Sequence, residues 1–103
     1  MRIELLFIEG CPNLSLARRN LTTALRRSGI EDVEVIERLV GPEDHQAPPG
    51  MHGSPTILID GVDPCAPERN EVSVCCRRYP AAHGATGAPT VNALIDALAS
   101  VRR

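Results

Sequence analysis

The sequence predicts a single α/β domain over residues 1–103, in which a βαβ unit is followed by a β-hairpin and a C-terminal helix on a mixed four-stranded sheet. Three features of the first 40 residues predict this class: an almost continuous apolar stretch, then apolar residues at three- and four-residue spacing, then a stretch rich in β-branched residues. A strand, a helix and a strand in that order imply a right-handed βαβ unit with parallel strands.

Each element of this unit has its own signal in the sequence. Arg2–Ile8 is expected to be the first strand, because a strand covered on both faces is apolar along its whole length. Leu14–Ser28 is expected to be an amphipathic helix that ends at Gly29, a residue suited to the left-handed conformation. Val33–Val40 is expected to be the second strand, since its β-branched residues are interleaved with charges.

The second half of the chain predicts a hairpin and a helix. After a proline-containing connector, Thr56–Asp60 is expected to be the third strand, closed by an Asp60-Gly61 turn. Glu71–Tyr79 is expected to be the fourth strand, antiparallel to the third. Thr90 is expected to cap the last helix. The buried stripe of that helix comprises Val91, Leu94, Ile95 and Leu98.

Composition excludes several classes of protein. The 103 residues carry 11 basic and 13 acidic side chains and only two aromatic ones, Phe7 and Tyr79, so neither the basic stripe nor the stacking surfaces of a nucleic-acid binder are present. No apolar run approaches the roughly 20 residues of a membrane helix. The sequence shows no export signal, so we expect a cytoplasmic protein whose four cysteines stay reduced and serve chemistry or metal binding.

Cys11 is the first candidate for a reactive group. It follows the first predicted strand and precedes a helix, with Pro12 expected at or near the first helical position. The positive end of a helix stabilises an anion, so a thiol placed there is favoured as a thiolate nucleophile or a ligand of a soft metal. The alternative is a buried structural cysteine that happens to begin a helix.

The second candidate feature is the segment Gly53-Ser54-Pro55-Thr56 before the third strand. Proline cannot donate to a strand ladder, so it marks either the first residue of a strand or a special turn. In a βαβ-then-hairpin chain, a cis bond at Pro55 would hold this loop against the start of the first helix. For Ser-Pro-Thr taken alone, an ordinary trans-proline strand start is the alternative.

Four motifs occur in order along the chain: Gly10 to Asn13 (Gly-Cys-Pro-Asn), Gly53 to Thr56 (Gly-Ser-Pro-Thr), Cys76 to Tyr79 (Cys-Arg-x-Tyr) and Gly87 to Thr90 (Gly-Ala-Pro-Thr). With the order of the elements, they resemble the small thioredoxin-like proteins of bacteria. The resemblance implies a thioredoxin fold, Cys11 as the active-position thiol and Ser54-Pro55 as a cis-proline loop facing it. It transfers no defined activity, because fold does not fix function.

One departure from the thioredoxin pattern limits the chemistry. Redox thioredoxins have a second cysteine three residues after the first, and here that position is Leu14. Cys11 is therefore expected to form a mixed disulfide with another molecule, or to pair with a cysteine that the fold brings close.

Cys75 and Cys76 are the candidates for that second cysteine. If the third and fourth strands form an antiparallel hairpin, the end of the fourth lies beside Ser54-Pro55, and with it Cys11. Neighbouring strand residues point to opposite faces, so only one of the pair can face the first helix. Cys76 is favoured because it occupies the cysteine of the Cys-Arg-x-Tyr motif. The alternative is that both are small core residues.

The remaining cysteine and the histidines are expected to be bystanders. Cys65 lies in a loop predicted to be remote from Cys11. The histidines have no partner ligand at zinc-finger spacing; they are His45, His52 and His83. Residues 76–91 also resemble a short stretch of alkylmercury lyases, and thiolates select soft metals.

Three functions follow as hypotheses. The first is thiol–disulfide exchange, an oxidoreductase activity, in which Cys11 attacks the disulfide of a protein or a low-molecular-weight partner and Cys76 resolves the product. The second is capture of a soft metal such as mercury by Cys11 with Cys75 or Cys76, or an alkylmercury lyase-like activity. The third is a partner-binding scaffold without chemistry. No bound cofactor, nucleic acid or membrane is expected in any of them.

Overall fold

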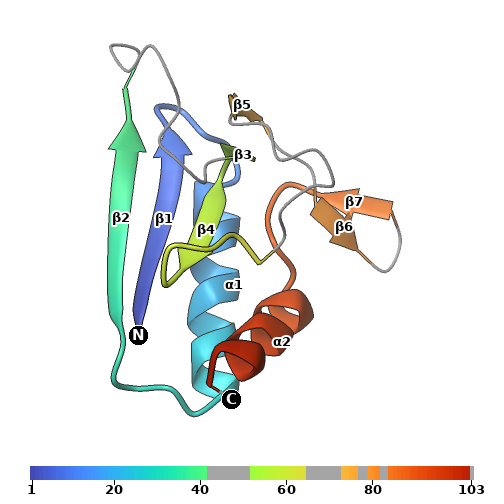
Figure 1. The fold of residues 1–103 in the computed structure, drawn as a ribbon. Helices are drawn as coiled ribbons and strands as arrows, with labels where there is room; N and C mark the ends of the chain where they lie inside the picture. The colour runs from blue at the N-terminus through green and yellow to red at the C-terminus, as the bar shows by residue number, and fades with distance from the viewer. Residues whose placement is uncertain (42–51, 65–72, 77–78, 82–83, 103) are drawn as a thin grey trace.

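Two helices pack against one face of a small mixed sheet in the computed structural model of the protein (Figure 1). The structure describes residues 1–41, 52–64, 73–76, 79–81 and 84–102. The elements are, in chain order, β1 (Arg2–Ile8), α1 (Leu14–Arg27), β2 (Glu34–Val40), β3 (His52–Ser54), β4 (Thr56–Ile59), β5 (Ser73–Cys76), β6 (Tyr79–Ala81), β7 (Gly84–Thr86) and α2 (Val91–Arg102).

The predicted βαβ unit is confirmed. β1 pairs in parallel with β2, and α1 connects them. The C-cap of α1 is Ser28, and Gly29 follows it with a φ of 69°, in the left-handed region where glycine is favoured. β2 begins one residue later than predicted, at Glu34, which is within the usual uncertainty of strand ends.

The core lies between the sheet and the two helices. The main sheet has the order β2-β1-β4, with β4 antiparallel to β1, so that Ile3 lies opposite Ile59 and Leu5 opposite Ile57. These four side chains pack against the apolar stripes of the helices, which comprise Ala17, Leu21 and Ala24 of α1 and Leu94 and Leu98 of α2. Burying each leucine fully stabilises the fold by about 1.5–3 kcal/mol.

The predicted cap and buried stripe of the last helix are confirmed. Thr90 Oγ1 accepts a hydrogen bond from the backbone N–H of Ala93 at 3.1 Å, which satisfies one of the N–H groups left open at a helix start. Leu94 and Leu98 are fully buried, and Val91 and Ile95 pack beside them. Neither helix of the described chain is long and apolar enough to cross a membrane.

The predicted hairpin between the third and fourth strands was wrong. Within the described residues the main sheet has three strands, and the segment expected as one fourth strand contains β5 and the start of β6. β5 pairs in parallel with β3, not antiparallel with β4. The Asp60-Gly61 turn forms, with positive φ at both residues, but a long connection over residues 60–72 follows β4, and only short loops fix the direction of the next strand.

An ion pair ties α1 to the edge strand β2. Arg18 donates two hydrogen bonds to the carboxylate of Glu37, at 2.8 and 2.6 Å. These bonds and the positive charge of the guanidinium hold the pKa of Glu37 below its usual value. Both side chains are partly exposed, so the pair orients β2 against the helix more than it adds stability.

Candidate functional site

Cys11 lies in the turn between β1 and α1, half-buried and outside any disulfide. Its backbone N–H donates to the carbonyl of Ile8 at 3.2 Å, and its carbonyl accepts from the N–H of Leu14 at 3.5 Å. The helix begins at Leu14 with Asn13 as its N-cap, so Pro12 lies before the cap and not in the first helical turn. Cys11 is thus three residues ahead of the helix that was expected to begin beside it.

Ser54 is joined to the same turn through Ile8. The hydroxyl of Ser54 accepts a hydrogen bond from the backbone N–H of Ile8 at 3.1 Å, while the carbonyl of Ile8 accepts from Cys11. A single residue at the end of β1 therefore links Cys11 to Ser54, 43 positions along the chain from it. Ser54 is fully buried, which means that this link is shielded from competing water.

The Ser54-Pro55 peptide bond is cis, as the thioredoxin-like resemblance implied. The loop around it is held by its own side chains: Thr56 Oγ1 donates to the carbonyl of Gly53 at 2.6 Å, and Gly53 has a φ of 139°, a value that favours glycine. Pro55 and Thr56 are fully buried. The Gly-Ser-Pro-Thr motif is therefore a structural unit in which each residue has a distinct role.

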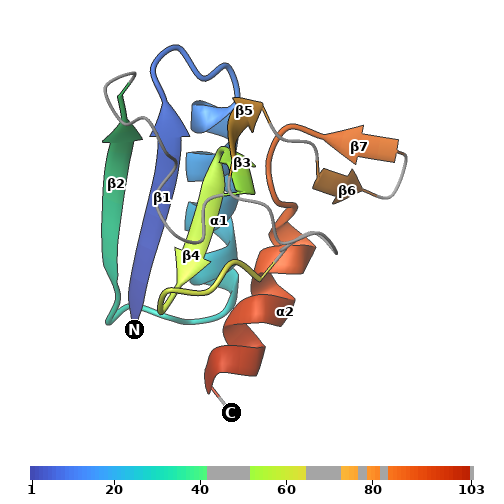
Figure 2. The ribbon, with the colours of Figure 1, turned by 45° about the horizontal axis from the view of Figure 1, so that its top comes forward.

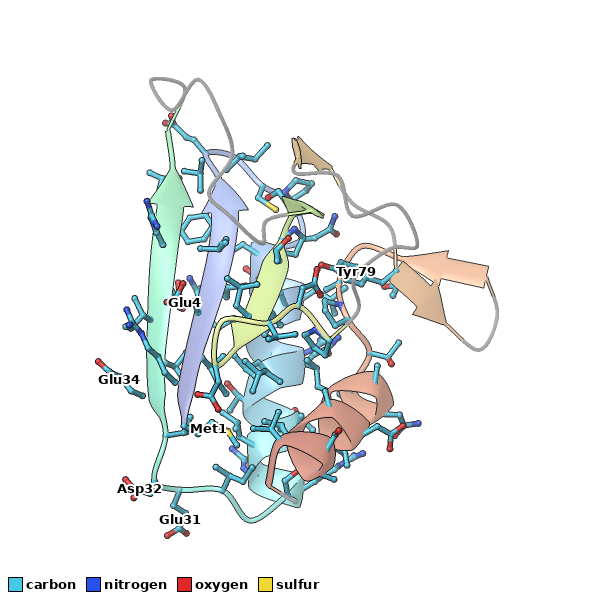
Figure 3. All side chains as sticks on the ribbon, in the orientation of Figure 1. Met1, Glu4, Glu31, Asp32, Glu34 and Tyr79 are labelled. Carbon is cyan, nitrogen blue, oxygen red and sulfur yellow. The ribbon has the colours of Figure 1, made fainter. Side chains whose placement is uncertain are left out.

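Tyr79 fastens this loop from the opposite side. Its side chain is 2% exposed, and its hydroxyl donates a hydrogen bond to the carbonyl of Pro55. Figure 3 shows Tyr79 at the root of the β6–β7 hairpin, where that hairpin meets the rest of the domain. The tyrosine of the Cys-Arg-x-Tyr motif thus contacts the proline of the Gly-Ser-Pro-Thr motif.

The backbone of Cys76 lies beside Ser54. The two residues are register partners in the β3–β5 pair. In both Figure 1 and Figure 2, β3 and β5 lie at the end of α1 where the helix begins, next to the turn that contains Cys11. The strand direction expected for this segment was wrong, yet Cys76 still lies at the start of the third strand, because a parallel partner reaches the same position from the other end.

The fourth motif meets the first at Asn13. The backbone of Gly87 lies so close to the Asn13 side chain that a Cβ atom added at Gly87 would overlap its amide group. Further along the helix, the side chain of Asn20 donates to the carbonyl of Pro89 at 2.9 Å. The residues between β7 and α2 therefore follow the first two turns of α1.

We expect Gly87→Ala to lower the free energy of unfolding by about 1–3 kcal/mol, because the new methyl group must displace Asn13 in a packed region. Urea denaturation measures the loss. In an Asn13→Ala background the same change at Gly87 should cost much less, since the overlapping amide is gone. An equal cost in both backgrounds would show that the two motifs do not touch.

Sequence reasoning placed Cys11, Ser54, Pro55 and Cys76 together but assigned no role to Tyr79, Gly87 or Asn13. Their only signal was membership of the four motifs. The hydrogen bond from Tyr79 and the close approach of Gly87 connect segments far apart in the sequence, and no local pattern specifies such pairs.

Several predicted positions lie outside the described residues, namely Cys65, His45 and His83. Cys75 lies in β5 next to Cys76. Among the side chains that the structure describes, no group of three or more His, Cys, Asp or Glu residues could hold a metal ion. Comparisons with models of known protein families, with curated proteins and with solved structures find no match to this chain.

Proposed function

We propose that this protein is a cytoplasmic, thioredoxin-like thiol protein that exchanges disulfides through Cys11, with Cys76 as the resolving thiol. The observation that carries the proposal is the hydrogen-bonded link from Cys11 through Ile8 to Ser54, whose register partner is Cys76. The βαβ unit, the cis bond before Pro55 and the C-terminal helix support the thioredoxin-like assignment. A reducing compartment suits the mechanism, because both cysteines must begin as thiols.

The reaction has two exchange steps. The Cys11 thiolate attacks one sulfur of a partner disulfide, which forms a mixed disulfide and releases the other sulfur as a thiolate that takes up a proton. Cys76, as its thiolate, then attacks Cys11 Sγ, so that a Cys11–Cys76 disulfide forms and the second partner thiol leaves. The partner is reduced by two electrons and the protein is oxidised by two. A low-molecular-weight thiol, as external reductant, returns the protein to its dithiol state.

Half-buried Cys11 is suited to the first step. Its thiol is accessible to a partner, while the turn that carries it is fixed by two backbone hydrogen bonds and by the buried loop behind it. Positioning of this kind lowers the entropic cost of bringing two sulfurs into line. Leu14, where a dithiol thioredoxin has cysteine, cannot supply the second step, and for this reason we assign that step to Cys76.

Two variants test the assignment of roles. With glutathione disulfide as substrate, Cys76→Ser should accumulate a stable glutathione adduct on Cys11, because nothing resolves it, whereas Cys11→Ser should form neither that adduct nor an internal disulfide. Intact-protein mass spectrometry follows both products, and Cys65→Ser serves as the matched control that should behave as wild type. An unchanged adduct yield in Cys11→Ser would contradict the proposal. Stoichiometric Hg(II) binding by Cys11 without any exchange would favour the soft-metal alternative.

A further inference from the structure

The outer side of β2 has backbone groups that no described strand pairs with. β2 is the edge strand of the main sheet, and β1 occupies its inner side. The N–H of Glu34 donates inward to the carbonyl of Met1 at 3.2 Å, and successive residues of a strand point their backbone groups to opposite sides. The N–H and C=O groups of Val35, Glu37 and Leu39 therefore point outward. In Figures 1 and 2 no helix or strand of the described chain lies beyond β2 on this side.

The side chains along this edge do not give it the usual protection. Val35 is 43% exposed and Leu39 is 52% exposed, which are high values for large apolar residues on an ordered strand. Edge strands commonly avoid self-association with charges that would repel a second copy. β2 instead carries charges of opposite sign four residues apart, Glu34 and Arg38. Figure 3 shows the Glu34 side chain directed away from the sheet at the outer margin of β2.

Opposite charges at this spacing are complementary to themselves. If two copies of β2 pair antiparallel about a two-fold axis at Ile36, Glu34 of each copy lies directly opposite Arg38 of the other, and Ile36 lies opposite its own copy. Val35 then faces Glu37 of the second copy in a hydrogen-bonded pair, because the outward backbone groups of both residues meet there. Val33 faces Leu39 in the same way, so an exposed apolar residue gains an apolar neighbour.

Other registers that keep the helices of both copies on one face fit less well. An axis at Glu37 places two Glu37 carboxylates directly opposite each other, and like charges in that position are destabilising. An axis at Val35 leaves Leu39 and Val40 beyond the end of the shared ladder. The register about Ile36 alone combines backbone pairing with two attractive charge pairs.

We propose that β2 is a self-association edge through which two copies of this chain form an antiparallel, two-fold symmetric dimer. The two three-stranded sheets become one continuous sheet, with the helices of both copies on the same face. The interface is isologous, as is usual for dimers. Because the strands run in opposite directions, the two Cys11 turns lie at opposite ends of the shared sheet and both stay open to partners. The proposal does not depend on the chemistry of Cys11.

Charge exchange tests this register. Light scattering coupled to size exclusion, over a concentration series, should give wild type twice its monomer mass of 11.1 kDa. Glu34→Arg or Arg38→Glu alone should weaken dimerisation by about tenfold, because each reversal replaces two attractive pairs with two repulsive ones. The double variant Glu34→Arg/Arg38→Glu should regain the dimer, because it restores opposite charges with their signs exchanged.

A matched control is Glu31→Arg, an exposed change of the same size just before β2 that lies outside the proposed ladder. It should leave the dimer intact. A wild-type chain that stays monomeric at every concentration overturns the proposal. So does a double variant no more dimeric than the single ones, or a dimer that both single variants leave unchanged, which would have to use another surface.

Discussion

Leu14→Cys should give this protein the local dithiol that it lacks. Cys11 and Leu14 are the first and last residues of a turn closed by the 3.5 Å contact between the Cys11 carbonyl and the Leu14 N–H. The ends of such a turn lie less than about 7 Å apart at Cα, and a disulfide accepts about 4.4–6.8 Å. On oxidation with glutathione disulfide, the variant should therefore form a disulfide between Cys11 and the introduced thiol and lose two hydrogens. It should also accelerate the reduction of insulin by a small thiol, which wild type should do poorly.

The control for this gain of function is Leu14→Ala. Leu14 is half-buried and packs against the main core, so any substitution there removes some apolar contact. Leu14→Ala has that loss without the new thiol and should show no disulfide and no added insulin reduction. If Leu14→Cys keeps both of these thiols free under the same oxidising conditions, the turn does not hold positions 11 and 14 as described.

Tyr79→Ala should be among the most damaging single changes in the chain. Tyr79 is the largest fully buried side chain among the described residues, and truncation of a buried aromatic residue costs about 3–5 kcal/mol of unfolding free energy. Tyr79→Phe isolates the hydroxyl. It keeps the ring but removes the hydrogen bond to the buried carbonyl of Pro55, which should cost about 1–3 kcal/mol. Chemical denaturation of both variants gives the two values.

Thr22→Val is the matched control for the lost hydroxyl. The Thr22 hydroxyl also donates to a backbone carbonyl, that of Arg18 at 2.9 Å, but it does so on the exposed face of α1. Its loss should cost less than about 0.5 kcal/mol. A Tyr79→Phe variant no less stable than Thr22→Val would show that Tyr79 does not anchor the Pro55 loop.

The first 40 residues and the last helix were predictable because their signals are local. The apolar run of β1, the helical spacing in α1 and the Thr90 cap each specify an element without reference to the rest of the chain. The cis bond before Pro55 was implied by a resemblance and not by its own three residues, since most bonds of this type are trans.

The middle of the chain was predicted less well for a physical reason. Pairing of β5 depends on which backbone edge is open when the long connection returns, and on Pro55, whose missing N–H separates β3 from β4. The location of Cys76 beside Ser54 was nevertheless anticipated, because both strand directions lead to it. The contacts of Tyr79 with Pro55 and of Gly87 with Asn13 are tertiary and follow only from the folded chain.

The central claim is that Cys11 and Cys76 act as one redox pair, and peptide mapping of the oxidised wild-type protein tests it most directly. After treatment with glutathione disulfide and alkylation of the remaining thiols, mass spectrometry of the digest should find a peptide pair cross-linked between Cys11 and Cys76. The same cross-link should persist in Cys75→Ser. If Cys11 is instead recovered only as its glutathione adduct, with Cys76 alkylated, the two cysteines do not form the pair and the proposed mechanism is contradicted.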